Sequence, residues 1–308
     1  MKKATSIILA ILFTGLLAQA QKFNPDETEK SLVMIEIKKG SKGYACSGFI
    51  WKDPKTVITS LHAMKHGAEY TVIYSNKYRR SAKVIAVYPD ADLVMLETNI
   101  NERPLTEPVV PIKTYNSVKP GFGEKLYAQG YHGGSKGHRT AHLIKGDANP
   151  ETLERLVVKE EEKNLLRNLG FPKIDLDILY LNGSLWPGFS GSPVYNAKGE
   201  LVAVGNGGLE NGATGVSWAI PASYITKLEK SGTANLPDNL EQISLLMSSQ
   251  VEVDIAPGNT AEDAIQQQLD EEYTVYEGGA FEFSKTKNRS FEEMYNSSFE
   301  TENLDYFI

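Results

Sequence analysis

The chain has 308 residues but only one cysteine, Cys46, so no intramolecular disulfide can form. We expect Cys46 to be a small buried apolar residue rather than a nucleophile. A net positive charge is also missing: the net charge of −7 and a pI of about 5.4 exclude an electrostatic footprint for nucleic acid. No glycine motif that would hold a phosphate occurs either, and we expect no cofactor.

Long hydrophobic runs are missing outside the N-terminus. Residues 1–20 join Lys2 and Lys3 to an apolar run over 7–17 and then to Ala18-Gln19-Ala20, which is typical of a secretory signal peptide. The run is shorter than the ~18 residues that a membrane span requires, so we favour cleavage over an uncleaved anchor helix. We therefore expect an exported chain, periplasmic or secreted, with no membrane span after signal removal.

Short β-type runs are abundant. They are rich in Val, Ile, Tyr and Thr and are separated by turn signals. The expected strands are 32–37, 44–51, 56–60, 70–74, 82–88 and 92–97 in one block, and 125–129, 141–144, 175–181, 192–195, 201–204 and 215–220 in a second. Six short strands in so little sequence are typical of a small closed barrel. The sequence thus predicts an all-β fold of two packed six-stranded antiparallel barrels, residues 21–120 and 121–232, with any site in the crevice between them.

Two helices are expected within this β pattern. Asn149-Pro150 is a start signal and Gly170-Phe171-Pro172 a stop signal, which predicts a helix of about five turns inserted in the second barrel over residues 149–170. We favour a solvated surface decoration over a lid or a partner-docking helix. Residues 221–230, after the last expected strand, predict a closing helix.

An acidic tail follows, over residues 233–308. Residues 231–308 carry 3 Lys and Arg against 16 Asp and Glu, whereas residues 21–230 carry 27 against 23. Such a composition is typical of disorder. Nine aromatic residues between Tyr273 and Phe307 nevertheless indicate local docking, either on the chain's own basic core or on a partner.

The stretch Gly188-Phe189-Ser190-Gly191-Ser192-Pro193-Val194 is the strongest chemical signal. It can be an ordinary turn, the nucleophile elbow of an α/β-hydrolase, or the serine of a chymotrypsin-type histidine, aspartate, serine order. The elbow requires glycine in place of Ser192 and a histidine after the serine. All five histidines precede Ser190, so the first and third interpretations remain.

Two upstream residues match the required order. His62 lies just past the apolar strand 56–60, and Asp92 directly precedes the apolar run 93–96, where its carboxylate could orient a histidine out of water. Asp90 suits a turn cap. His62 and His66 have zinc-helix spacing, but Ala63 stands where zinc hydrolases need their glutamate.

A further group is His132, His138 and His142. Three histidines could hold a metal, but their glycine-rich neighbourhood favours a mobile surface loop, so no metal site is expected.

With Ser60-Leu61-His62-Ala63, residues 92–96 and residues 188–193 in this order, the chain resembles the trypsin-like serine peptidases. It is most similar to their bacterial, disulfide-free branch, which includes the Deg-type periplasmic proteases and the glutamyl endopeptidases, over roughly residues 31–230. The resemblance implies an exported endopeptidase acting on proteins or peptides through an acyl-enzyme. It implies Ser190 as nucleophile, His62 as general base and then acid, Asp92 as the residue that orients His62, and the N–H groups of Gly188 and Ser190 as oxyanion hole.

The departures from this family bear on specificity and regulation. Phe189 stands where vertebrate trypsins have an aspartate that pairs with a new N-terminus, so that activation switch should be absent. The resemblance makes Ser184 the pocket floor and Gly207 and Gly208 its walls, which argues against cleavage after Lys or Arg and for a small or apolar residue. No PDZ-like segment follows the protease block. Two alternatives stay open: a catalytically idle binding module, and a latent enzyme covered by the tail or the inserted helix.

Overall fold

The computed structural model describes residues 23–75, 77–99, 101, 109–132, 135–145, 151–157, 159–208, 215–246, 251–255, 260, 264, 273–275 and 281–283. The expected signal peptide lies outside these residues. Within the described part of the chain, no helix combines the length and apolar character needed to cross a membrane.

The N-terminal block forms a closed ring of six antiparallel strands, whose order is β1-β4-β5-β6-β3-β2 with β2 pairing back to β1. A seventh strand, β13 (Val251–Asp254), joins the outer edge of β2. The six ring strands are β1 (Leu32–Lys39), β2 (Lys42–Ile50), β3 (Thr56–Ser60), β4 (Glu69–Tyr74), β5 (Arg79–Tyr88) and β6 (Leu93–Thr98).

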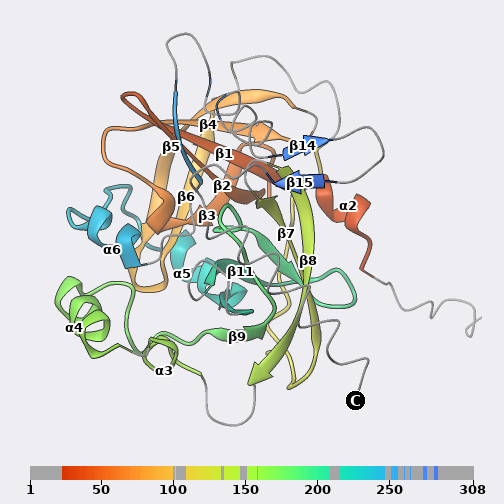
Figure 1. Cartoon of the computed structure of the whole chain (residues 1–308), viewed down its shortest axis with the longest axis vertical. Helices are drawn as coiled ribbons and strands as arrows, with labels where there is room; N and C mark the ends of the chain where they lie inside the picture. Colours follow the sequence, from red (N-terminus) through yellow and green to blue (C-terminus); the bar gives the residue numbers. More distant parts are fainter. Residues whose placement is uncertain are drawn as a thin grey trace, which may run out of the picture.

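The C-terminal block forms a second closed barrel, in the order β10-β11-β12-β9-β8-β7. Its strands are β7 (Lys125–His132), β8 (Ser135–Lys145), β9 (Leu179–Asn182), β10 (Pro193–Tyr195), β11 (Leu201–Gly208) and β12 (Val216–Pro221). Figure 1 shows this barrel in yellow, green and teal beside the orange N-terminal barrel. The expected all-β fold of two six-stranded barrels is confirmed.

The β7–β8 hairpin corrects the expectation of a surface loop around residues 130–137. Gly130 pairs with Gly137 and Tyr131 with Lys136, so both strands run almost to the hairpin tip. Because cross-strand backbone pairing does not depend on side chains, the glycines that read as loop residues are accommodated within the strands.

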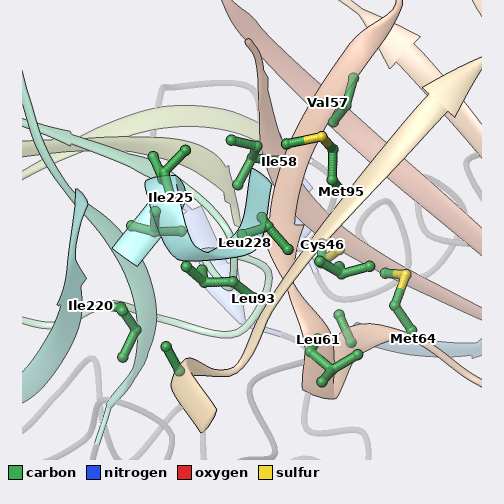
Figure 2. Packing of buried hydrophobic residues seen from close by; sticks show 14 of the residues in the cluster. Cys46, Val57, Ile58, Leu61, Met64, Leu93, Met95, Ile220, Ile225 and Leu228 are labelled. Carbon is green, nitrogen blue, oxygen red and sulfur yellow. The ribbon is translucent and has the colours of Figure 1, made fainter. Parts of the chain in front are cut away.

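The apolar cores of the two blocks are built differently. The interior of the C-terminal barrel holds a separate cluster that includes Leu126, Leu181, Phe189 and Val194. The larger cluster fills the N-terminal barrel and continues into the interface between the barrels. There the short helices η4 (Ala222–Tyr224) and α5 (Ile225–Glu229) close the chain against the first barrel, and Figure 2 shows Ile225 and Leu228 of α5 among residues of β3 and β6.

The inserted helix is interrupted, so the expectation of one continuous five-turn helix is wrong. The structure has α3 (Leu153–Leu156) and α4 (Glu160–Leu169), with Val157 extended between them and Gly170 ending α4 in a left-handed conformation. Leu153 and Leu166 are both buried in the large cluster. In one straight helix, at 100° per residue, they would point about 140° apart, so the break allows both to reach the core.

The C-terminal tail contributes ordered elements to the fold. Helix α6 (Leu240–Leu246) buries Leu240 and Ile243 in the large cluster and packs against η1 and α4. Further on, β14 (Tyr273–Val275) pairs with β15 (Phe281–Phe283). At the other end of the described chain, α2 (Pro25–Glu29) is capped by Asn24.

Candidate active site

His62 and Asp92 are carried by two short turns at one end of the N-terminal barrel. His62 lies in η1 (Leu61–Ala63), which follows β3, and Asp92 ends η2 (Pro89–Ala91), which precedes β6. Strands β3 and β6 are antiparallel, with Ser60 opposite Leu93, so the two turns leave the sheet side by side. Asp92 adopts a left-handed conformation with φ of 54°, which costs about 1–3 kcal/mol for a non-glycine residue and requires compensating contacts.

Those contacts come from the His62 turn. Asp92 accepts a 2.8 Å hydrogen bond from the backbone N–H of His62 at Oδ1, and its Oδ2 lies 2.5 Å from His62 Nδ1. The backbone N–H of Leu61 donates to the Asp92 carbonyl at 2.9 Å. A buried carboxylate in this position favours the tautomer with the proton on Nδ1, which leaves Nε2 as an acceptor.

Ser190 is carried by the C-terminal barrel, in the loop between β9 and β10. Gly188 and Gly191 on either side have φ values of 96° and 84°, which L side chains rarely adopt. Phe189 anchors the loop from below, because its ring is buried in the barrel interior. The Ser190 hydroxyl oxygen lies 2.9 Å from His62 Nε2 and 3.1 Å from the Asn206 carbonyl, and its single proton can be donated to one of them at a time.

Ser47 of β2 joins the two barrels at this loop. Its hydroxyl donates to the Gly188 carbonyl at 2.6 Å and accepts from the Tyr131 N–H at 2.8 Å, while its own N–H donates to the Ser190 carbonyl at 3.0 Å. Gly191 lies so close to β2 and β3 that a Cβ atom would be 2.3 Å from the Ser47 carbonyl. Contacts this close hold the serine loop against the first barrel.

Asn206 is a site residue that the sequence reasoning missed. Its Nδ2 donates to Asp92 Oδ2 at 2.6 Å, and its Oδ1 accepts from Trp218 Nε1 at 2.7 Å. Because the Trp218 indole can only donate, the bond to Oδ1 fixes which end of the Asn206 amide faces Asp92. The only sequence signal was position: an asparagine in a glycine-rich strand end, sixteen residues after the candidate nucleophile.

The expected pocket residues occupy varied surroundings. Gly207 lies against Trp218, whose ring atoms would be 2.7 and 2.8 Å from an added Cβ, so the missing side chain makes room for that indole. Ser184 lies between β9 and the serine loop and is partly exposed, as is Gly208 at the end of β11. None of these positions brings a charged group.

The three candidate catalytic residues are almost completely buried in this structure. His62, Asp92 and Ser190 are 0%, 2% and 1% exposed.

Cys46 is also fully buried, and burial raises the pKa of its thiol to about 12, so it stays protonated and unreactive at neutral pH.

Among the described residues, no three potential metal ligands lie close enough together to hold an ion. His132 ends β7, and His138 and His142 lie in β8. The Pro237 carbonyl lies 2.8 Å from His66 Nε2 and can accept a hydrogen bond from it.

Comparison with known proteins finds serine endoproteases that are similar to this chain. DegP-like probable periplasmic serine endoproteases are 25% identical over 193 residues in Brucella suis and 27% identical over 179 residues in Pseudomonas fulva. These matches cover 61% and 58% of this chain but only 33% and 32% of the relatives, so the chain spans about a third of their length.

Solved structures show the same fold at low sequence identity. The active form of the Rv3671c protease from M. tuberculosis has a TM-score of 0.52 at 18% identity, covering 72% of this chain and 92% of that one. The HtrA-type protease AlgW with a tripeptide has a TM-score of 0.52 at 16% identity, covering 67% and 61%. A profile for the trypsin-like peptidase domain matches residues 46–204, just over half of the sequence, and the chain therefore belongs to that family.

Proposed function

We propose that this protein is an exported serine endopeptidase in which Ser190, His62 and Asp92 act together. The observation that carries the proposal is the continuous chain of short contacts from Asp92 Oδ2 to His62 Nδ1 and from His62 Nε2 to Ser190 Oγ. Three residue types from two barrels, in this order and at hydrogen-bond distance, match what nucleophilic catalysis by serine requires.

The proposed reaction follows from these positions. His62 Nε2 takes the Ser190 hydroxyl proton as Oγ attacks the scissile carbonyl carbon, and Asp92 stabilises the resulting imidazolium. His62 then gives that proton to the leaving amine, which departs with the C-terminal product. Water repeats the attack on the acyl-enzyme ester with His62 as base, which releases the acid and restores Ser190.

The N–H groups of Gly188 and Ser190 are the proposed oxyanion donors. Support comes from the positive φ of Gly188 and from the Ser47 hydrogen bond that holds its carbonyl, because both restrict the backbone next to the nucleophile. Preorganised donors of this kind contribute on the order of 3 kcal/mol to a transition state. Ser184, Gly207 and Gly208 are the proposed lining of an uncharged primary pocket, suited to a small or apolar residue.

The domain organisation and location are proposed on the same basis. Residues 1–20 would be a cleaved signal, residues 21–120 and 121–232 the two catalytic barrels, and residues 233–308 an appended acidic segment. The periplasmic names of the DegP-like relatives support export. The rival function is a binding module with an idle site, which predicts an unreactive serine.

Labelling with a fluorophosphonate tests the proposal. The purified chain 21–308 should react at Ser190, and Ser190→Ala should not react while keeping its circular dichroism spectrum. Ser192→Ala is the matched control, because Ser192 is buried two residues away and its hydroxyl has no hydrogen-bond partner among the described residues. Absence of labelling in folded wild-type protein, with or without detachment of the tail, would favour the binding module.

A further inference from the structure

The outer edge of β2 leads directly away from the candidate nucleophile, and a strand from the chain's own tail lies on it. We propose that residues 251–255 act as a built-in competitor, which occupies this edge in place of an extended peptide that would be cleaved at Ser190. The inference rests on the proposed function.

The backbone of β2 shows that Ser190 and the tail share one edge. The Ser47 N–H donates to the Ser190 carbonyl at 3.0 Å, and the Ile255 N–H donates to the Ser41 carbonyl at 2.9 Å. Val251 is paired with Ala45. Because strand residues two apart direct their backbone groups to the same side, positions 41, 43, 45 and 47 all face this edge. Val251 therefore lies about 7 Å along the strand from the point where Ser190 is held.

The direction of β13 matches that of a departing peptide. Its first residue, Val251, lies nearest the Ser190 attachment, and Asp254 lies opposite Lys42, farther away. An extended substrate whose scissile carbonyl is at Ser190 Oγ would continue in the same antiparallel sense along this edge. Adding a strand to an exposed edge is a general way to bind peptides, in which backbone hydrogen bonds supply affinity and side-chain pockets supply selectivity.

An apolar surface outside the barrel receives alternate side chains of the added strand. Val253 and Ile255, two residues apart, are 5% and 8% exposed. They are buried with Leu32, Met34 and Ala45 from β1 and β2, with Ile73 of β4 and with Tyr131 of β7. The edge therefore suits an extended peptide with apolar residues at every second position.

A second anchor holds the tail just before β13. Helix α6 buries Leu240 and Ile243 and packs against η1, the turn that carries His62. Glu241 of α6 forms an ion pair with Lys39 at the end of β1. The tail is thus attached at the turn that carries His62 and along the strand edge that leads to Ser190.

The burial of His62, Asp92 and Ser190 shows that the candidate site must open before a protein substrate can bind. A substrate carbonyl must approach within about 3 Å of Ser190 Oγ, whereas the three residues are at most 2% exposed. Some part of the chain must therefore move before a protein substrate can bind. Release of β13 frees the edge of β2 without disturbing the ring of six strands, because β13 pairs only with β2 among the described strands.

A reversible crosslink tests this on the full mature chain. Lys42 and Asp254 are paired in β2 and β13, so Lys42→Cys with Asp254→Cys should form a disulfide that holds the tail on the edge. Cys46 should not interfere because it is fully buried. We expect casein cleavage at least tenfold slower in the oxidised than in the reduced protein. The single variant Lys42→Cys, which should not respond to reductant, is the control.

Release of the strand is the complementary experiment. Val253→Asp combined with Ile255→Asp should raise casein cleavage at least tenfold, whereas Ala234→Asp, at an exposed tail position, should not. A synthetic peptide of residues 250–256 should inhibit the released variant and restore slow hydrogen exchange of the amides at 43 and 45.

The outcomes separate the two proposals. Fluorophosphonate labelling of Ser190 combined with equal casein cleavage in the oxidised and reduced crosslinked protein would overturn the edge inference and leave the enzyme intact. Failure of the probe to react with any form, including the released variant, would overturn the proposed function itself. Should the released variant not fold, the crosslink alone decides, because both of its states are one polypeptide.

Discussion

The two barrels contribute to the candidate site by different physical means. In the N-terminal barrel, His62 and Asp92 are held by hydrogen bonds between a carboxylate and nearby N–H groups, and Asp92 itself takes the left-handed conformation. In the C-terminal barrel, Ser190 is held between two glycines that take left-handed conformations instead. The residues from the N-terminal barrel are thus positioned mainly by polar side-chain contacts. The serine loop of the C-terminal barrel depends mainly on two glycines, which can take these conformations because they have no side chain.

This difference shows where the site is vulnerable. Polar contacts can be weakened one at a time, with losses of about 1–3 kcal/mol each, whereas a glycine at a positive φ in a crowded position tolerates no side chain. The contacts of Ser47 and Asn206 join the two halves across the barrel interface. Substitutions of the glycines and of the polar residues should therefore lower stability and catalytic rate by different amounts.

The largest effect is expected from Gly191→Ala. The added Cβ would lie 2.1 Å from Thr59 Oγ1 and 2.3 Å from the Ser47 carbonyl, at a φ of 84°. We expect unfolding free energy to fall by about 3 kcal/mol or more and kcat/KM by at least about 100-fold, because a shift of 1 Å in the nucleophile is enough for such a loss. Gly199→Ala, at a φ of 76° and with no atom closer to the added Cβ than Phe23 Cα at 4.0 Å, is the control for backbone strain alone. Equal losses in the two variants would contradict the idea that the close contacts of Gly191 hold the serine loop against the first barrel.

Asn206→Leu should have the next largest effect. It removes a donor to the buried Asp92 carboxylate, and hydrogen bonds to charged groups contribute about 1.5–3 kcal/mol, or roughly 10- to 100-fold in rate. We expect kcat to fall with KM nearly unchanged in steady-state kinetics on a small peptide. Trp218→Phe keeps an aromatic ring but removes the Nε1 donor, which frees the Asn206 amide to rotate, and should reproduce part of the loss. An unchanged kcat in both variants would show that Asn206 does not help to position Asp92.

Ser47→Ala should cost less. It leaves the Gly188 carbonyl and the Tyr131 N–H without their hydroxyl partner, which should lower the unfolding free energy by about 1–3 kcal/mol and slow acylation several-fold. Ser60→Ala is the matched control, since Ser60 is equally buried but makes one 3.3 Å bond to Gly205. Denaturant unfolding and the rate of fluorophosphonate labelling measure the two effects, and indistinguishable variants would contradict a special role for Ser47.

The smallest effect concerns Cys46, where no chemistry is expected. Burial raises the pKa of its thiol to about 12, so the folded protein should not react with a thiol reagent at pH 8 and the denatured protein should react fully. In the unfolded chain the thiol ionises first, near its ordinary pKa of 9.0, so stability should fall as pH rises from there towards 12. Rapid modification of the folded protein would show that the core at β2 opens.

Much of the arrangement was predictable from local pattern. Alternating apolar strands and turn signals predicted both barrels, since each strand's own residues decide which of its faces is buried. The order His62, Asp92, Ser190 predicted which residues could act together. Three features were not predictable: the long β7–β8 hairpin, the break at Val157 and the contact between Asn206 and Asp92. Each depends on contacts with other parts of the fold, which the local sequence does not reveal.

The tail shows most clearly the difference between what local sequence predicts and what contacts with distant parts of the chain decide. Its acidic composition, taken alone, is typical of disorder, and only its aromatic residues indicated docking. The sequence by itself determined the two blocks of six strands and the identity of the candidate nucleophile, base and orienting carboxylate, because strand periodicity and residue chemistry are local properties. Only the tertiary structure decided that Trp218 orients Asn206, that Ser47 clamps the serine loop and that Val251–Asp254 lies on β2, because an edge or a buried polar group is satisfied by whichever segment the whole fold brings to it.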